Sequence, residues 1–195
     1  MSESIYGEHL PEMRRVMDGV MEEIQNYREA ELEKTGMDPV EHCLSRIKSE
    51  DSMREKCRRR ELPETEESAL EEIRDAIGIR VVCAFLSDVY GVRDYLKSLP
   101  GYEVIEEKDY ISHAKENGYR SYHMILKTGG YYVEVQLRTI SMDTWAALEH
   151  NMKYKRNVKG REALLVAELK RCADELASTD VSMQTIRDLI FQEEL

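Results

Sequence analysis

The sequence lacks long hydrophobic runs and paired cysteines. No apolar stretch approaches the ~18 residues that a membrane span requires, and no signal-peptide pattern opens the chain. The four cysteines are scattered and form no CxxC or CxxH pair, which argues against a zinc ribbon and against a disulfide framework. We therefore expect a cytoplasmic protein that has no contact with membranes.

Two common catalytic motifs are also absent. The chain contains neither HExxH nor the Walker A pattern GxxxxGK[ST], so zinc hydrolysis and P-loop chemistry have no support. It has no internal repeats and no low-complexity segment. With 195 residues, 42% of them hydrophobic and 34% charged, the chain can bury one core and is expected to form a single domain over residues 1–195.

Acidic residues outnumber basic ones by 39 to 28, which gives a net charge of −11. This balance is unfavourable for stable DNA binding, and RNA as a partner has no support beyond a local patch of arginines. The bases are unevenly distributed, because residues 46–60 hold seven bases and only three acids. A basic cluster on an acidic protein favours a small, phosphate-rich ligand over a nucleic-acid polymer.

Hydrophobic periodicity and turn residues predict the order of the helices and strands. Helices are expected over residues 8–34, from Asp38-Pro39 into the basic cluster, over residues 88–98, from near Ser141, and over two C-terminal segments separated by a cap at residues 178–180. Strands are expected over residues 80–86, 102–110, 120–127 and 131–139, the last two joined by Gly129-Gly130. This order predicts an α+β fold, with a small, mostly antiparallel or mixed sheet flanked by helices.

The predicted strand at residues 131–139 alternates between two kinds of side chain. Its apolar set belongs to the core, and its other face carries Tyr132, Glu134, Gln136 and Arg138. A row of this kind can form a reactive site, but a solvated sheet face has the same pattern. A second carboxylate, Asp75, precedes the first predicted strand, where it can join Glu134 in holding Mg²⁺ or can simply cap a helix.

Two further segments carry candidate binding residues. Lys48, Ser52 and Lys56 are spaced by four, which predicts one helix face that binds a polyphosphate or is merely solvated. The segment at residues 115–123 turns at Asn117-Gly118 and then presents Tyr119, whose ring can stack on a base. His123 in the same segment can contact a phosphate or satisfy a hydrogen bond in the core.

These segments, taken in order, resemble motifs of the RelA/SpoT-type alarmone synthetase family. The matching strings are RIKSEDSMREK at 46–56, DAIGIR at 75–80, KDYI at 108–111, KENGYRSYH at 115–123, EVQLRT at 134–139, and MDTWAALEH at 142–150 followed by YK at 154–155. The resemblance covers residues 40–155 and implies a nucleotidyltransferase-like synthetase core there. It further implies a stand-alone small synthetase, with a helical N-terminal extension over 1–39 and C-terminal helices over 156–195.

The resemblance implies an activity and a set of roles. Family members transfer pyrophosphate from ATP to the 3′-hydroxyl of GDP or GTP with the help of Mg²⁺, giving ppGpp or pppGpp and AMP. By motif position Asp75 and Glu134 would hold the metal, and Glu134 would also be the general base. The residues that would bind ATP are Arg46, Lys48, Ser52, Lys56 and Arg80, the two arginines flanking the adenine. Those that would bind the acceptor nucleotide are Lys115, Asn117, Tyr119, His123 and Gln136. Small synthetases of this family are typically homotetramers, so a homo-oligomer is expected.

The sequence leaves two alternatives and one substrate preference open. The same transfer can use an adenosine nucleotide or the 3′ end of tRNA, because Tyr119 can stack on any base, and a catalytically silent nucleotide- or RNA-binding module is a further possibility. Glu50 and Ala114 replace prolines that many members carry. The segment Glu106-Glu107-Lys108-Asp109 mixes two versions of a motif linked to acceptor preference, which leaves GDP against GTP undecided.

Overall fold

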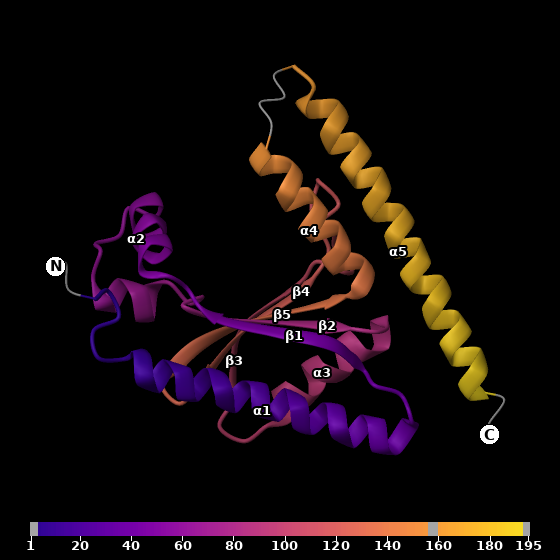
Figure 1. Ribbon diagram of the computed structural model, residues 1–195, viewed down its shortest axis with the longest axis horizontal. Helices are drawn as coiled ribbons and strands as arrows, with labels where there is room; N and C mark the ends of the chain where they lie inside the picture. The colour runs from indigo at the N-terminus through magenta and orange to yellow at the C-terminus, as the bar shows by residue number, and fades with distance from the viewer. Residues whose placement is uncertain (1–3, 156–159, 193–195) are drawn as a thin grey trace.

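The computed structural model describes residues 4–155 and 160–192, which form one five-stranded sheet with helices around it (Figure 1). In chain order the elements are α1 (Leu10–Thr35), β1 (Val40–Ile47), α2 (Glu50–Arg59), the π-helical turn η1 (Ser68–Glu72), β2 (Ile77–Cys83), α3 (Leu86–Ser98), β3 (Glu103–Asp109), β4 (Tyr122–Thr128), β5 (Tyr131–Thr139), α4 (Ile140–Lys155) and α5 (Glu162–Gln192). The predicted α+β class is therefore confirmed. No helix within the described ranges is long and apolar enough to cross a bilayer.

The sheet is mixed, with strand order β1-β2-β5-β4-β3. Only the central β2–β5 pair is parallel, and the other three pairs are antiparallel. β4 and β5 are joined at Gly129 and Gly130, whose φ angles of 56° and 85° are those that a two-residue hairpin turn of type I′ requires. The predicted hairpin is thus confirmed together with its turn residues.

Helices α1 and α3 cover one face of the sheet and close the core. The face consists of alternate residues of the three inner strands, which are buried: Ile77, Ile79, Val81, Met124, Leu126, Val133, Val135 and Leu137. α1 contributes Met13, Val20 and Ile24, and α3 contributes Val89, Val92 and Leu96. Burial of each such side chain stabilises the fold by roughly 1.5–3 kcal/mol, which fixes the orientation of the strands. The residues that alternate with them must therefore point to the opposite face of the sheet. α2 and α4 stand at opposite ends of that second face (Figure 1).

The prediction of a helix from Asp38-Pro39 into the basic cluster is wrong. Residues 40–47 form β1, which pairs antiparallel with β2 at the edge of the sheet. As an edge strand it exposes most of its side chains, so it lacks the strict alternation that identifies a strand in sequence. Helix α2 begins only at Glu50, with Ser49 as its N-cap. Lys48 therefore precedes the helix and does not share a helix face with Ser52 and Lys56.

The predicted break at residues 178–180 is also wrong, because α5 continues through it without interruption. Polar side chains in the supposed cap and just after it make other bonds. Thr179 Oγ1 and Ser182 Oγ donate to the carbonyl oxygens four residues earlier, at 3.1 and 2.9 Å. Asp180 is buried, and its carboxylate accepts a hydrogen bond of 2.6 Å from Thr139 at the end of β5. The residue thus ties α5 to the sheet.

Candidate active site

The register of the sheet builds the site, because directly paired residues lie side by side on one face. Two rows of paired residues cross all five strands on the face opposite α1 and α3. The first row is Arg46, Gly78, Glu134, Ile125 and Glu106, and the second is Leu44, Arg80, Gln136, His123 and Lys108. Predicted residues from separate motifs are therefore neighbours. The polar face of β5, which the sequence left open between a site and a solvated surface, lies beside residues of the other motifs.

Asp75 and Glu134 lie between two cavities. One cavity has a volume of about 390 Å³ and is lined by Leu44, Ser45, Arg46, Lys48, Asp75, Gly78, Ile79, Arg80, Glu134 and Gln136. The other has a volume of about 250 Å³ and is lined by Lys56, Arg60, Glu72, Arg74, Asp75, Glu106, Lys108, His123, Ile125 and Glu134. We call them the Arg80 cavity and the Lys108 cavity. Both carboxylates border both cavities, so ligands on the two sides would meet at them.

Asp75 is held by two lysines and keeps one oxygen without a partner. Its Oδ2 accepts from Lys48 Nζ at 2.8 Å and also from Lys56 Nζ. Burial raises the pKa of this carboxyl, but the two ammonium groups outweigh it, so the pKa lies below its ordinary value. Burial also lowers the pKa of Lys56 despite its contact with Asp75. The Oδ1 of Asp75 is buried and has no hydrogen-bond partner among the described residues.

That orphaned oxygen is the feature that fits a cation. A buried carboxylate oxygen without a partner is costly, and a hard divalent ion such as Mg²⁺ prefers oxygen ligands. Within residues 4–155 and 160–192 no cluster of three or more His, Cys, Asp or Glu side chains could bind a metal by itself. Mg²⁺ typically takes only one or two carboxylates and completes its shell with water and substrate phosphates. Asp75 and Glu134 therefore suit that ion.

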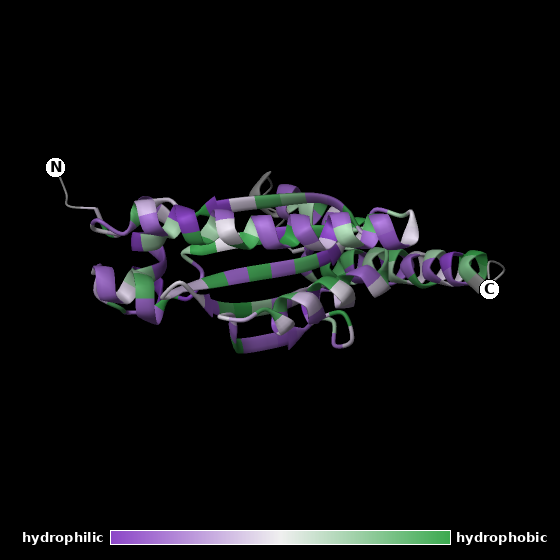
Figure 2. Cartoon of the chain, turned by 90° about the horizontal axis from the view of Figure 1, so that it is seen from below, coloured by the Kyte–Doolittle hydropathy of each residue, from purple (hydrophilic) through white to green (hydrophobic). Residues whose placement is uncertain are grey.

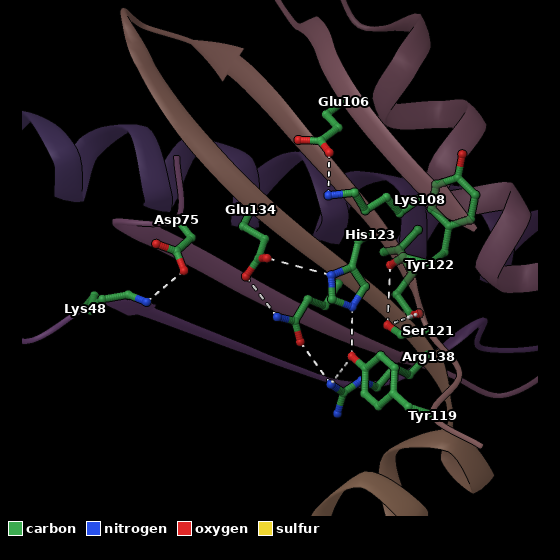
Figure 3. A network of polar contacts seen from close by, with 12 residues as sticks. Lys48, Asp75, Glu106, Lys108, Tyr119, Ser121, Tyr122, His123, Glu134 and Arg138 are labelled. Carbon is green, nitrogen blue, oxygen red and sulfur yellow. Dashed lines mark hydrogen bonds and ion pairs between the residues drawn. The ribbon is translucent and has the colours of Figure 1, made fainter. Parts of the chain in front are cut away.

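Glu134 belongs to a closed polar network (Figure 3). Its Oε2 accepts from Gln136 Nε2 at 2.9 Å, and its Oε1 lies 3.7 Å from His123 Nδ1. Burial raises the pKa of Glu134, but His123 and the Gln136 amide favour the charged form and hold the pKa below its ordinary value. Arg138 Nη2 donates to Gln136 Oε1 at 3.0 Å and to Tyr119 Oη at 2.9 Å, and that hydroxyl lies 2.8 Å from His123 Nε2. The network fixes these side chains in one orientation.

The predicted acceptor residues gather at the α4 end of this network. Lys115 Nζ lies 4.9 Å from the centre of the Tyr119 ring, a cation–π contact. Asn117 Oδ1 accepts the Tyr119 amide at 3.2 Å, which closes the predicted turn. His123 engages both Tyr119 and Glu134 and borders the Lys108 cavity, so it faces the site and is not a core histidine. Lys115, Asn117 and Tyr119 border neither cavity. They are connected to the Lys108 cavity through the hydrogen bond between Tyr119 and His123.

The predicted donor residues divide between the two cavities. Arg46, Lys48 and Arg80 line the Arg80 cavity, whereas Lys56 lines the Lys108 cavity. Ser52 lines neither: it is exposed, and its Oγ accepts from Ser49 Oγ at 2.9 Å within the first turn of α2. The expectation that Ser52 shares a face with the two lysines depended on a helix that begins too late to include Lys48.

Sequence reasoning missed Asp143 and gave Arg138 no role. Asp143 Oδ1 accepts from Arg138 Nη1 at 2.9 Å and lies 3.4 Å from Arg80 Nη1, so one carboxylate from α4 links the two arginines. Arg138 was visible as the last member of the alternating series on β5. Asp143 lies in the MDTWAALEH string, where only its apolar neighbours gave a periodic signal.

Glu50, which departs from the family pattern, anchors the N-terminal segment. Its carboxylate accepts from Ser4 Oγ at 2.7 Å and from the Ile5 amide at 3.3 Å. Next to it, the buried Tyr6 donates its hydroxyl to the Lys48 carbonyl oxygen at 2.7 Å. The segment that a proline would stiffen is held here by hydrogen bonds to the chain before α1.

Comparison with known proteins places the chain. Residues 45–159 match the family model described as the region found in RelA / SpoT proteins. The chain belongs to the RelA/SpoT family. It is 39% identical over 160 residues to the GTP pyrophosphokinase YwaC of Bacillus subtilis, an alignment that covers 78% of this chain and 76% of the relative. The family resemblance drawn from the motif strings is thus confirmed.

Solved structures of this family share the fold. The crystal structure of small alarmone synthetase 2 from Bacillus subtilis superposes with a TM-score of 0.81 at 33% identity, over 93% of this chain and 98% of that one. Small alarmone synthetase 1 from the same organism, bound to its product pppGpp, gives a TM-score of 0.78 at 28% identity over 91% and 94% of the two chains. The fold of this RelA/SpoT protein is therefore that of the small alarmone synthetases.

Proposed function

We propose that this chain transfers the pyrophosphoryl group of ATP to the 3′-hydroxyl of GDP or GTP in the presence of Mg²⁺, releasing AMP. The observation that carries the proposal is the position of Asp75 and Glu134 between two cavities with cationic walls. A transfer between two nucleotides needs two binding volumes that meet at one reacting centre. The names of the relatives, a GTP pyrophosphokinase and a synthetase with bound pppGpp, agree with this assignment.

The Arg80 cavity is the proposed donor site. Its wall carries two guanidinium groups, Arg46 and Arg80, on neighbouring strands, and planar guanidinium groups stack on purine rings. Lys48 lies on the same wall beside Asp75, where an ammonium group can bind phosphate oxygens. Bound Mg²⁺ would be held by Asp75 and Glu134 and would withdraw charge from the donor phosphates as a Lewis acid.

The Lys108 cavity is the proposed site of the acceptor's phosphates. Four cationic side chains, Lys56, Arg60, Arg74 and Lys108, line it together with His123. Lys108 forms an ion pair of 2.5 Å with Glu106. The segment at residues 106–109 thus contributes one acidic and one basic side chain to the wall of the Lys108 cavity. The base of the acceptor would stack on Tyr119 at the far end of the network.

Glu134 is the proposed proton acceptor. The acceptor's 3′-oxygen forms a bond to the β-phosphorus of ATP while the bond from that phosphorus to the oxygen bridging the α-phosphate breaks, and AMP leaves with that oxygen. The proton of the 3′-hydroxyl passes to Glu134, which is ionised because its pKa is low. The Gln136 amide holds the carboxylate in place during this step.

An assay with several acceptors tests the proposal. Purified protein is incubated with Mg²⁺ and ATP labelled at the β-phosphorus, with GDP, GTP, ADP or deacylated tRNA in parallel. We expect label on the guanosine nucleotides and an equal amount of AMP. Label on ADP or tRNA alone would support pyrophosphoryl transfer but contradict a guanosine nucleotide as the acceptor. Nucleotide binding without AMP release would support the silent-module alternative.

We also propose that the chain forms a homo-oligomer, most simply a tetramer, in the compartment that holds its nucleotide substrates, the cytoplasm. The support lies on α5, where hydrophobic residues recur along the part that leads to the C-terminus (Figure 2). The large exposed apolar side chains of this helix are Leu164, Leu165, Val166, Val181, Met183, Ile186, Leu189 and Ile190. They form two groups, near the start and near the end of the helix. A soluble monomer rarely exposes so many large apolar side chains on one helix, so a second copy is the proposed cover.

A further inference from the structure

The acceptor loop, residues 115–121, rests directly on α5. Gly118 lies in the left-handed region with φ = 91°, and a Cβ built on it would come within 2.6 Å of Ala173 Cβ and 3.0 Å of Lys170 Cα. The backbone of the loop and the surface of the helix are therefore in van der Waals contact, with no room for another carbon atom between them. Gly118 satisfies the turn and also this close approach.

Polar contacts fasten the loop and its surroundings to the same helix. Arg120 Nη2 donates to Asp174 Oδ1 on α5 at 3.0 Å, and its Nη1 donates to the Gly118 carbonyl oxygen at 3.3 Å. Trp145 of α4 donates its indole N–H to the Leu169 carbonyl oxygen at 2.8 Å. The rings of Trp145 and Tyr119 meet edge to face, with their centres 6.3 Å apart. Helix α5 thus supports Tyr119 indirectly, through the loop backbone at Gly118 and through Trp145.

We infer that α5 positions the acceptor nucleotide, with Ala173 and Asp174 as positioning residues that seat the loop carrying Lys115, Asn117 and Tyr119. The inference rests on the proposed function and deepens it. No residue of α5 lines the Arg80 cavity or the Lys108 cavity, so these residues act through the loop and touch neither carboxylate. Displacing the loop should weaken the acceptor's binding and leave ATP binding unchanged.

The first test variant is Ala173→Leu, which fills the space that Gly118 occupies. We expect the KM for GDP or GTP to rise at least about tenfold while the KM for ATP stays within about twofold. The matched control is Ala167→Leu on the exposed side of the same helix, six residues earlier, which should change neither value. Equal increases in both KM values, or no increase at all, would contradict a role in seating the loop.

A second variant guards against misfolding of the first. Asp174→Ala removes the ion pair with Arg120, and an exposed one with Lys170, without adding volume. Its control, Glu175→Ala, removes an exposed ion pair with Arg171. We expect Asp174→Ala to raise the acceptor's KM severalfold and Glu175→Ala to leave it unchanged. If both variants behave alike, Asp174 has no positioning role.

Two readouts do not depend on activity. Trp145 is the single tryptophan, so its fluorescence reports the contact with α5 and Tyr119. Ala173→Leu should shift its emission to longer wavelength and speed tryptic cleavage after Lys115 or Arg120, whereas Ala167→Leu should do neither. If the wild-type protein transfers nothing, the proposed function fails, but these two readouts still decide whether α5 seats the loop. Unchanged emission and cleavage in Ala173→Leu would overturn the inference.

Discussion

Gly78 lies on the wall of the Arg80 cavity, where any side chain would take up cavity volume. It lies in the row between Arg46 and Glu134 and lines the Arg80 cavity. Its backbone is not in the left-handed region, and a Cβ there would meet only the Arg46 carbonyl oxygen, at 3.9 Å. The strand therefore does not need glycine for its conformation, and the missing side chain leaves volume in the proposed donor cavity.

Gly78→Val is expected to block the donor cavity while the protein stays folded. Valine suits a strand, and its methyl groups would project between Arg46 and Glu134. We predict that the KM for ATP rises at least about tenfold with little change in the acceptor's KM, and that Gly78→Ala has a smaller effect. Steady-state kinetics with each substrate varied in turn measures this. An unchanged KM for ATP in Gly78→Val would contradict the proposal that ATP binds in the Arg80 cavity.

The low pKa values of Asp75 and Glu134 give a second prediction at this scale. A carboxyl group with a lower pKa in the folded state stabilises the fold above its unfolded pKa, and this contribution is lost as the pH falls through the folded value. Carbon-13 NMR titration of the carboxyl groups should place the inflections below 3.8 for Asp75 and below 4.5 for Glu134. Inflections above these values would mean that burial outweighs the lysines, His123 and Gln136.

At the scale of elements, α5 is joined to α3 by a buried ion pair. Arg187 donates to Asp88, and the exposed fractions of the two side chains are 13% and 6%. Asp88 also accepts the Phe85 amide at 3.1 Å, which caps the first turn of α3, and Arg187 lies over the Phe85 ring. Burial raises the pKa of Asp88 even though Arg187 favours the charged form. Removing either residue would leave the other buried without its opposite charge, which is costly.

Asp88→Ala is expected to destabilise the fold strongly. It leaves the buried Arg187 without a carboxylate to balance its charge and leaves the start of the helix uncapped, so the free energy of unfolding should fall by roughly 3–5 kcal/mol. The control is Asp94→Ala on the same helix, whose side chain is 63% exposed and pairs with Arg93, where the loss should be about 0–1 kcal/mol. Urea denaturation of both variants measures the difference. Equal losses would show that burial of the pair contributes nothing.

The elements also show how far sequence reasoning reaches. Strands with one buried face, such as β5, and helices with a strict stripe, such as α1, could be predicted because packing imposes their period. β1 could not, since an edge strand with exposed side chains carries little period of its own. The break placed in α5 came from residues 178–180, where the Thr179 hydroxyl bonds back within the helix and Asp180 accepts from Thr139. The first error concerns a distant partner strand, and the second concerns a choice between two local bonds that the same residue types can make.

The site shows the same limit. Motif order could predict which residues belong together, but only the folded structure places Asp75 and Glu134 at two shared cavities. Ser52 was assigned by helical spacing and lies outside both. Asp143 was missed because its role depends on two arginines that lie on strands far away in the sequence. A single carboxylate on α4 that links them produces no periodic pattern.

At the scale of the whole molecule, one face of the sheet packs into the core and the other carries the candidate site. α1 and α3 bury the first face, and α2 and α4 stand at opposite ends of the second (Figure 1). The polar rows of that second face follow from the register of the strands. α5 leaves an apolar surface uncovered in the single chain. The proposed oligomer would cover that surface and, because the same helix seats the acceptor loop, would also hold the loop's support in place.

Ile186→Glu combined with Leu189→Glu is expected to dissociate the proposed oligomer. Two charges in a buried apolar contact cost more than a stable interface can offset. Size-exclusion chromatography with light scattering should give about four times the 22.8 kDa chain mass for the wild type and a smaller assembly for the variant. The control Asn26→Glu, on the exposed side of α1, should keep the wild-type mass. A wild type that runs as a single chain would contradict the proposal.

The most direct measurement of the central claim is pyrophosphoryl transfer by Glu134→Gln. This substitution keeps the shape and the neighbours of the side chain but removes the charge and the proton acceptor. With the fold verified by thermal melting and ATP binding verified by calorimetry, we predict a loss of AMP release and of labelled guanosine product of at least about a thousandfold. A folded Glu134→Gln protein with wild-type transfer would show that the reaction does not take place between the two carboxylates.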